Sequence, residues 1–143
     1  MKIGITGTRN GTSDFQLSQL IEFFQNLSGP VELHHGDCIG VDTEVATIAK
    51  ACGFKVVCHP PVKPSLRGFF NSDEYRQPLS YFQRNRNIVD ETELLLVVPK
   101  ESSWQPNGGT WYTCDYAKNQ NRPYQIFWPQ PLTTAQLNAI IYT

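Results

Sequence analysis

Residues 1–11 read MKIGITGTRNG, a short apolar run that leads into a turn containing two glycines. The run from Lys2 to Thr6 has the character of a strand. In the turn that follows, the glycines allow backbone N–H groups to approach an anion, while Thr8 and Arg9 add a hydroxyl and a guanidinium. An ordinary strand-to-helix turn that contains an arginine has the same pattern, so this turn alone leaves both interpretations open.

The alternation of short apolar runs and amphipathic stretches continues along the whole sequence. It predicts strands over residues 2–6, 31–35, 54–58, 93–98 and 124–128, and helices over residues 14–27, 42–51, 81–90, 110–119 and 133–142. Ser13 or Asp14 is a natural N-cap for the first helix, and Thr133 or Thr134 for the last. Between residues 59 and 78 lies a long irregular stretch with four prolines. The pattern indicates an α/β Rossmann-like fold, a three-layer α/β/α sandwich around a mostly parallel sheet of about five strands.

Length and composition limit the classes of protein. With 143 residues and 40% hydrophobic residues, the chain is the size of one domain, and we expect a single domain over residues 1–143. The formal net charge is −1, so we do not expect nucleic acid or a membrane as partner. The sequence contains no signal-peptide pattern and no apolar run of membrane-spanning length, and we expect a cytoplasmic protein.

The cysteines and histidines favour neither a metal nor a cofactor. Cys38, Cys52, Cys58 and Cys114 are widely spaced, which argues against a zinc site and against a disulfide framework. His34 and His35 are adjacent in a predicted strand, so their rings point to opposite faces and cannot jointly hold a metal. We therefore expect reduced thiols, no metal and no cofactor. His59, at the end of the third strand, lies at the edge of the sheet where ligands bind.

A second loop of interest follows the second strand. Gly36 and Gly40 bracket a turn that leads to the start of a helix, where free N–H groups favour an anion. Asp42 is well placed as the N-cap of that helix. Asp37 is acidic, so it is better suited to sugar hydroxyls or to a loop amide than to phosphate. Cys38 lies in the same turn, between Asp37 and Asp42 in the sequence.

A third loop and a basic helix complete the pattern. Gly108, Gly109 and Thr110 open the helix after the fourth strand and form another anion-receptive turn. Arg84 and Asn85 lie on a helix in a locally basic region, residues 63–86. Because loops that follow parallel strands meet at one edge of the sheet, these groups predict a single ligand site.

The ordered set of motifs resembles the SLOG superfamily, which includes the Lonely Guy enzymes and the DNA-processing protein family. The residues that carry the resemblance are Gly7-Thr8-Arg9, Gly36-Asp37-Cys38-Ile39-Gly40-Val41-Asp42, Arg84-Asn85 with Ile88-Val89, and Gly108-Gly109-Thr110 with Thr113 and Ala117. The resemblance implies a nucleotide or nucleoside-phosphate site built from these loops. The ligand-binding residues that we expect are Gly7, Thr8, Arg9, Gly36, Asp37, Cys38, Gly40, Asp42, Arg84, Asn85, Gly108, Gly109, Thr110 and Thr113.

The resemblance to Lonely Guy enzymes implies cleavage of the N-glycosidic bond of a nucleoside 5′-monophosphate by an arginine and a glutamate. Arg84 matches the arginine, whereas the glutamate position is occupied by Thr113, which cannot supply a negative charge. Asp37, Asp42 or Asp115 could take that role, although Asp115 lies about 200° round the helix from Thr113. We therefore name Arg84, Asp37 and Asp115 as candidate catalytic residues.

Two functions remain open from the sequence. The first is a sensor, carrier or sequestering protein that binds a nucleotide-derived ligand without chemistry, which every motif supports. The alternative is an N-glycosidic hydrolase or transferase. Analogy with related folds further implies a homodimer. Aromatic residues surround the third loop and either stack on a base or belong to the core or an interface: Trp104, Trp111, Tyr112 and Tyr116.

Overall fold

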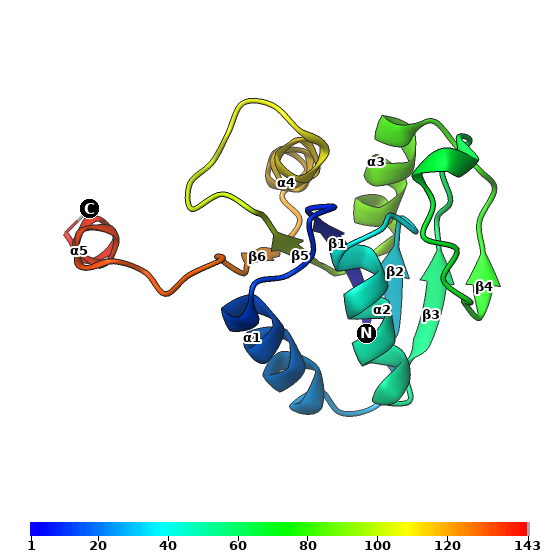
Figure 1. The fold of residues 1–143 in the computed structure, drawn as a ribbon, viewed down its shortest axis with the longest axis horizontal. Coiled ribbons are helices and arrows are strands. Elements are labelled where there is room, and N and C mark those ends of the chain that lie inside the picture. The colour runs from blue at the N-terminus through cyan, green and yellow to red at the C-terminus, as the bar shows by residue number, and fades with distance from the viewer. Residues whose placement is uncertain (143) are drawn as a thin grey trace.

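A parallel β-sheet forms the centre of the computed structural model, which describes residues 1–142 (Figure 1). Its six strands within that range lie in the order β4-β3-β2-β1-β5-β6, and every neighbouring pair is parallel. The strands are β1 (Lys2–Gly7), β2 (Glu32–His35), β3 (Lys55–Cys58), β4 (Glu74–Tyr75), β5 (Leu94–Val98) and β6 (Tyr124–Ile126). β5 reads LLLVV and lies between two strands, as expected of a strand covered on both faces.

Helices cover both faces of the sheet. They are α1 (Asp14–Gln25), α2 (Val41–Ala51), α3 (Tyr81–Glu91), α4 (Gly109–Asn119) and α5 (Thr134–Ile141), with a short 3-10 turn η1 at Pro64–Leu66. α1 and α2 pack on one face and α3 and α4 on the other, each pair over its own apolar cluster (Figure 1). This is the α/β/α sandwich that the sequence predicts. Each of the helices in residues 1–142 is too short or too polar to cross a bilayer.

The order of the strands reverses at β1. From β1 the chain moves outward through β2, β3 and β4, then returns to place β5 on the other side of β1. The connections leaving β1 and β5 therefore diverge onto opposite faces, and a crevice opens between their carboxyl ends. In open α/β sheets this crevice is where ligands bind.

Two details differ from the sequence-based expectations. β4 was not predicted, because its two residues, Glu74–Tyr75, pair with β3 through the backbone and carry no apolar pattern. Asp42 was predicted as the N-cap of α2, but that position is held by Gly40, with a φ of 88°, which favours glycine. The first helix begins as predicted, with Ser13 as N-cap and Gln16 completing a capping box.

Candidate functional site

A cavity of about 400 Å³ lies at the carboxyl edge of the sheet, in the crevice between β1 and β5. Its walls are Gly7, Thr8, Arg9, Asn10, Tyr81, Lys100, Gly109 and Thr110. They come from the turn after β1, the start of α3, the segment after β5 and the start of α4. The first and third loops identified in the sequence are thus brought together, at a volume within the range of small-molecule sites.

The walls of this cavity are electropositive. Arg9 and Lys100 are exposed, and neither takes part in an ion pair within residues 1–142. α4 begins at the cavity with Gly108 as N-cap, and no side chain caps its first N–H groups. Two cations and a helix N-terminus therefore face the same space, an arrangement that attracts an anion such as phosphate.

Tyr81 forms the inner wall of the cavity. Its ring centroid lies 5.7 Å from the guanidinium carbon of Arg9 and 5.0 Å from that of Arg84. The Tyr81 hydroxyl packs so closely against Gly109 that any Cβ there would overlap with it. Glycine at 109 is thus required for α3 and α4 to approach each other at the cavity.

Arg84 lies beneath Tyr81 and is only 1% exposed. Its Nη1 donates to the carbonyl oxygens of Gly36 and His59, the latter at 3.1 Å, and its Nε donates to Asn85 Oδ1 at 2.7 Å. A Cβ at residue 36 would lie 2.7 Å from the Arg84 guanidinium carbon, so only glycine admits this side chain. In this structure Arg84 holds the second loop in place, and Tyr81 separates it from the cavity.

The second loop closes on itself around Asp42. The Asp42 carboxylate accepts hydrogen bonds from the backbone N–H of Gly36 at 3.0 Å and of Cys38 at 3.3 Å. Burial raises the pKa of Asp42 to about 6, an effect that the positive charge of Arg84 opposes. Burial also raises the pKa of Cys38 to about 11, so its thiol stays protonated and is a poor nucleophile.

Asp37 is a structural carboxylate in this arrangement. It is fully buried, with one oxygen accepting from Arg67 Nε at 2.7 Å and the other from the backbone N–H of Phe70 at 2.9 Å. The sequence predicts that Asp37 binds either sugar hydroxyls or a loop amide, and in this structure it binds a loop amide. Asp37 fastens the segment after η1 to the second loop.

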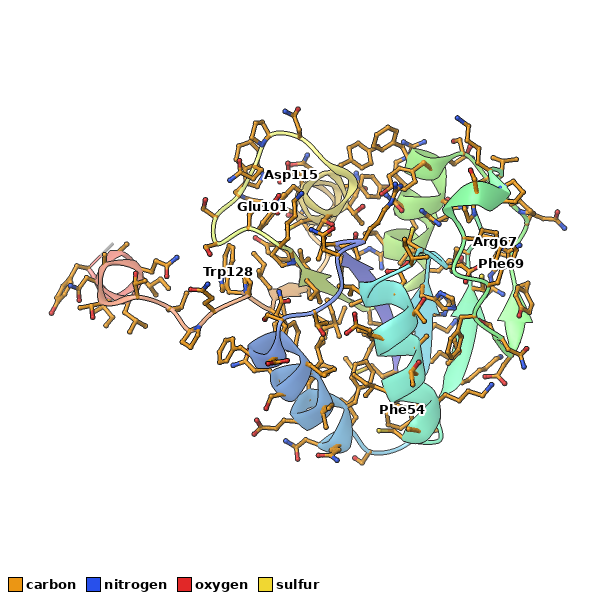
Figure 2. The ribbon with its side chains drawn as sticks, in the orientation of Figure 1. Phe54, Arg67, Phe69, Glu101, Asp115 and Trp128 are labelled. Carbon is orange, nitrogen blue, oxygen red and sulfur yellow. The ribbon has the colours of Figure 1, made fainter. Side chains whose placement is uncertain are left out.

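The candidate residues on α4 do not all lie at the cavity. Thr113 is buried, and its hydroxyl donates to the carbonyl of Gly109 at 2.7 Å. Asp115 accepts from Trp104 Nε1 at 3.0 Å and lines a separate hollow together with Trp111 and Trp128. Figure 2 shows Asp115 on the same side of the molecule as Trp128 and well away from Arg67. The candidate catalytic residues Arg84, Asp37 and Asp115 are therefore in three different environments, and none lines the cavity.

Asn10, Tyr81 and Lys100 line the cavity but were not among the expected site residues. Tyr81 begins a predicted helix and Lys100 follows a predicted strand, and both positions lie at the ligand-binding edge by topology. That placement was the only signal available in the sequence, because neither residue belongs to a glycine-containing motif.

A larger hollow of about 550 Å³ lies at the opposite edge of the sheet, lined by residues such as Pro30, Glu32, Phe54 and Glu93. It is at the amino ends of the strands, away from the crevice in which ligands of such sheets bind, and its lining contains both carboxylates and the cationic residues Lys2 and Lys55. For an anionic ligand the smaller cavity is therefore the better candidate.

Comparison with known proteins gives information on the fold. The sequence matches no protein-family model and no curated protein. Among solved structures, DNA processing protein A from Streptococcus pneumoniae aligns with a TM-score of 0.68 and 18% identity, over 99% of this chain and 54% of that one. The molybdenum cofactor binding protein from Rippkaea orientalis aligns with a TM-score of 0.66 and 18% identity, over 87% and 74%. DNA processing protein A from Helicobacter pylori, described by its single-stranded DNA binding mode, gives 0.60 and 15%, over 99% and 72%.

The Helicobacter protein corrects one expectation from composition. A net charge of −1 argues against nucleic acid as a partner, yet a protein with the same fold binds single-stranded DNA. The net charge of a chain does not report the local field, and here Arg9 and Lys100 make one edge positive. The expectation against nucleic acid, which rests on net charge, is therefore wrong. The chain has the Rossmann-like α/β fold that these structures share, as the resemblance implied.

Proposed function

We propose that this protein binds the phosphate end of a nucleotide or nucleotide-derived ligand in the cavity between β1 and β5. The observation that carries the proposal is the convergence of Arg9, Lys100 and the uncapped start of α4 on one space. Each of the three favours an anion, and they come from three separate elements. The Thr8 and Thr110 side chains lie in the same walls and offer hydroxyl groups to phosphate oxygens.

Binding without chemistry fits this cavity better than N-glycosidic cleavage does. The oxocarbenium-like state of that reaction needs a carboxylate beside the sugar. The cavity walls contain no aspartate or glutamate among residues 1–142, and Asp37 and Asp115 are engaged elsewhere. We infer a sensor, carrier or sequestering role.

The test is calorimetric titration with adenosine 5′-monophosphate, ribose 5-phosphate and adenosine, at one fixed ionic strength. Both phosphates should bind, and adenosine should bind at least about tenfold more weakly, because a charge-assisted hydrogen bond contributes roughly 1.5–3 kcal/mol. Arg9→Gln and Lys100→Gln should each weaken phosphate binding by a similar factor. Lys118→Gln, at the far end of α4, is the matched control and should leave binding unchanged.

Two outcomes would contradict the proposal. Equal affinity for adenosine and its monophosphate would mean that phosphate is not recognised. Equal loss in Lys118→Gln and Lys100→Gln would mean that only overall charge matters. If chromatography detects free adenine released during the titration, the result would instead support an N-glycosidic hydrolase.

A single-stranded nucleic acid is a second candidate, favoured by the Helicobacter neighbour and by an aromatic surface next to the cavity. Phe82 is 51% exposed, and its ring centroid lies 5.5 Å from that of Tyr81 and 4.5 Å from that of Tyr112. Arg86 donates to the Tyr112 hydroxyl at 2.8 Å. Exposed aromatic rings beside cations are what single strands use for stacking. If a fluorescent oligothymidylate binds, if Phe82→Ala weakens it, and if its affinity falls steeply with salt, this candidate replaces the small ligand.

A further inference from the structure

Two buried histidines and a glutamate meet on the α3 face of the sheet. His34 Nδ1 lies 2.9 Å from His59 Nε2, which lies 3.4 Å from the nearer carboxylate oxygen, Oε2, of Glu91. The three atoms all lie within 4.8 Å of one another. His34 lies within β2, His59 follows β3 and Glu91 ends α3, so three parts of the chain contribute one group each.

The two spacings that involve His59 Nε2 are close to those of a tetrahedral metal centre. With metal–ligand distances of 2.0–2.1 Å, neighbouring ligand atoms in a zinc site lie about 3.3 Å apart. The His59–Glu91 pair is already at that spacing, and the histidine pair has to open by about 0.4 Å. The histidines are 0% and 2% exposed and the Glu91 side chain 36%, so the group opens to solvent on one side.

The atoms of His34 and Glu91 that point away from the group are hydrogen-bonded to other residues, as is usual for metal ligands. His34 Nε2 lies 3.2 Å from Glu32 Oε1, which can only accept; this fixes the proton of neutral His34 on Nε2 and leaves Nδ1 with a free lone pair. Glu91 Oε1 accepts from Arg76 Nε at 3.0 Å, which leaves Oε2 facing the histidines. A histidine–carboxylate pair behind the metal is the common arrangement in zinc proteins.

When no ion is bound, a single hydrogen lies among His34 Nδ1, His59 Nε2 and Glu91 Oε2. His34 Nδ1 and Glu91 Oε2 are acceptors, so the hydrogen between them belongs to His59 Nε2. Burial lowers the pKa of His34. Burial is also the larger cause that lowers the pKa of His59 to about 3, and the neighbouring His34 adds to it, so both rings stay neutral. Neutral imidazole is the form that binds metals, and moving the His59 proton to Nδ1 would free the third lone pair.

A second group on the other face of the sheet, His35, Asp37 and Cys58, serves as an internal contrast. Both ring nitrogens of His35 are engaged, with Ser72 and with the Asp37 backbone N–H, at 2.8 and 2.9 Å. Both Asp37 oxygens are also engaged, and burial raises the pKa of Cys58 to about 12. Its histidine and carboxylate are thus already held by other partners and its thiol is protonated, so we interpret that group as part of the core.

We propose that His34, His59 and Glu91 bind a divalent transition-metal ion, with Zn²⁺ as the best fit and a fourth position open to solvent. Imidazole and carboxylate ligands in this number suit zinc better than magnesium or calcium, which prefer oxygen. Three protein ligands with an open position are the pattern of zinc sites that also hold a water or a substrate. The sequence expectation of no metal rests on the spacing of the cysteines and on the adjacent histidines His34 and His35. This site joins His34 to His59 across neighbouring strands.

The test is zinc titration of the full chain after treatment with a chelator, followed by calorimetry and by thermal unfolding. One ion should bind per chain and raise the unfolding temperature, and Mg²⁺ should do neither. Glu91→Gln should weaken zinc binding at least about tenfold, since it removes a charged ligand from a partly exposed position. Glu74→Gln is the matched control: Glu74 also contacts Arg76, at 3.0 Å, but is not a ligand, and its variant should bind as tightly as the unchanged chain.

His59→Gln is a second variant, checked for folding by circular dichroism, and should also lose zinc. X-ray absorption of the zinc-loaded protein separates this site from binding by cysteines: N/O ligands at 2.0–2.1 Å are expected, without sulfur near 2.3 Å. Sulfur ligation, unchanged affinity in Glu91→Gln, or no binding at millimolar zinc would overturn the proposal. All measurements omit nucleotide, so they are independent of the ligand proposed for the cavity.

Discussion

Arg84 is the largest of the fully buried side chains in residues 1–142, and its position changes how variants of this protein must be interpreted. Its guanidinium satisfies the carbonyls of Gly36 and His59 and lies near the buried Asp42 carboxylate. Removing it alters the second loop as well as any chemistry. An Arg84 variant therefore reports mainly on folding, and variants of Arg9 and Lys100 are better tests of ligand binding.

We predict that Arg84→Met lowers the free energy of unfolding by about 3 kcal/mol, because it removes the guanidinium donor from two buried carbonyls and the nearby cation from Asp42. Arg86→Met, two residues along α3, removes one half-exposed hydrogen bond to Tyr112 and should cost about 1 kcal/mol or less. Urea unfolding curves of the two variants and the unchanged chain measure this difference. Equal stability of the two variants would show that the buried arginine is not structural.

At the level of single residues, the sequence predicts the loop glycines but not their partners. Gly109 is identifiable from its motif, whereas Tyr81, which requires it, is 28 positions earlier and becomes its neighbour only after folding. Lys100 joins the cavity for the same reason. Conversely, Asp37 and Arg84 have the residue types of a site, but their burial and their partners cannot be inferred from spacing.

Among the elements, the contact between the starts of α3 and α4 determines the shape of the cavity. Gly109 lies against Tyr81 there. Replacing a glycine near a helix start with alanine ordinarily stabilises a protein by up to about 1 kcal/mol. Here the added methyl group would overlap with the Tyr81 ring. The local preference for alanine and the tertiary contact therefore act in opposite directions.

We predict that Gly109→Ala destabilises the protein by about 1–3 kcal/mol in the presence of Tyr81. In a Tyr81→Ala background the space is free, and the same substitution should be neutral or stabilising. The coupling energy from the four unfolding free energies should therefore be at least about 1 kcal/mol. Additive effects of the two substitutions would show that α3 and α4 do not meet through this pair.

Element boundaries were predictable to within a few residues wherever an apolar pattern exists. β1, α1, α3 and β5 follow alternation or helical spacing closely. β4 has only two residues and is held by backbone pairing, which has no sequence pattern. The start of α2 was misplaced at Asp42 because a side-chain N-cap is the usual signal, while Gly40 supplies the turn through its backbone alone.

For the molecule as a whole, the order of the strands explains why the site lies where it does. The reversal at β1 separates the two connections, and the positive groups that line the crevice belong to a chain with a net charge of −1. Composition averages over the surface, so it could not reveal this edge. Only the arrangement of the loops after β1 and β5 places Arg9 and Lys100 together.

The last helix has a different relation to the rest of the molecule. α5 lies apart from the sheet, at the end of an extended segment (Figure 1), and none of its side chains is buried. Ile140 and Ile141 are 65% and 66% exposed. Since apolar burial is the main source of stability, α5 contributes little of it.

We therefore predict that ending the chain after Pro131 changes the free energy of unfolding by less than about 1 kcal/mol, and the unfolding temperature by only a few degrees. Trp128→Ala, just before that point, is the comparison: Trp128 is half-buried, with its ring centroid 5.8 Å from that of Trp111, and its loss should cost about 2 kcal/mol. Thermal and urea unfolding of the shortened chain and of Trp128→Ala measure both effects. If the truncation costs as much as Trp128→Ala, then α5 packs against the body of the protein in solution, and the arrangement in Figure 1 does not hold for this helix.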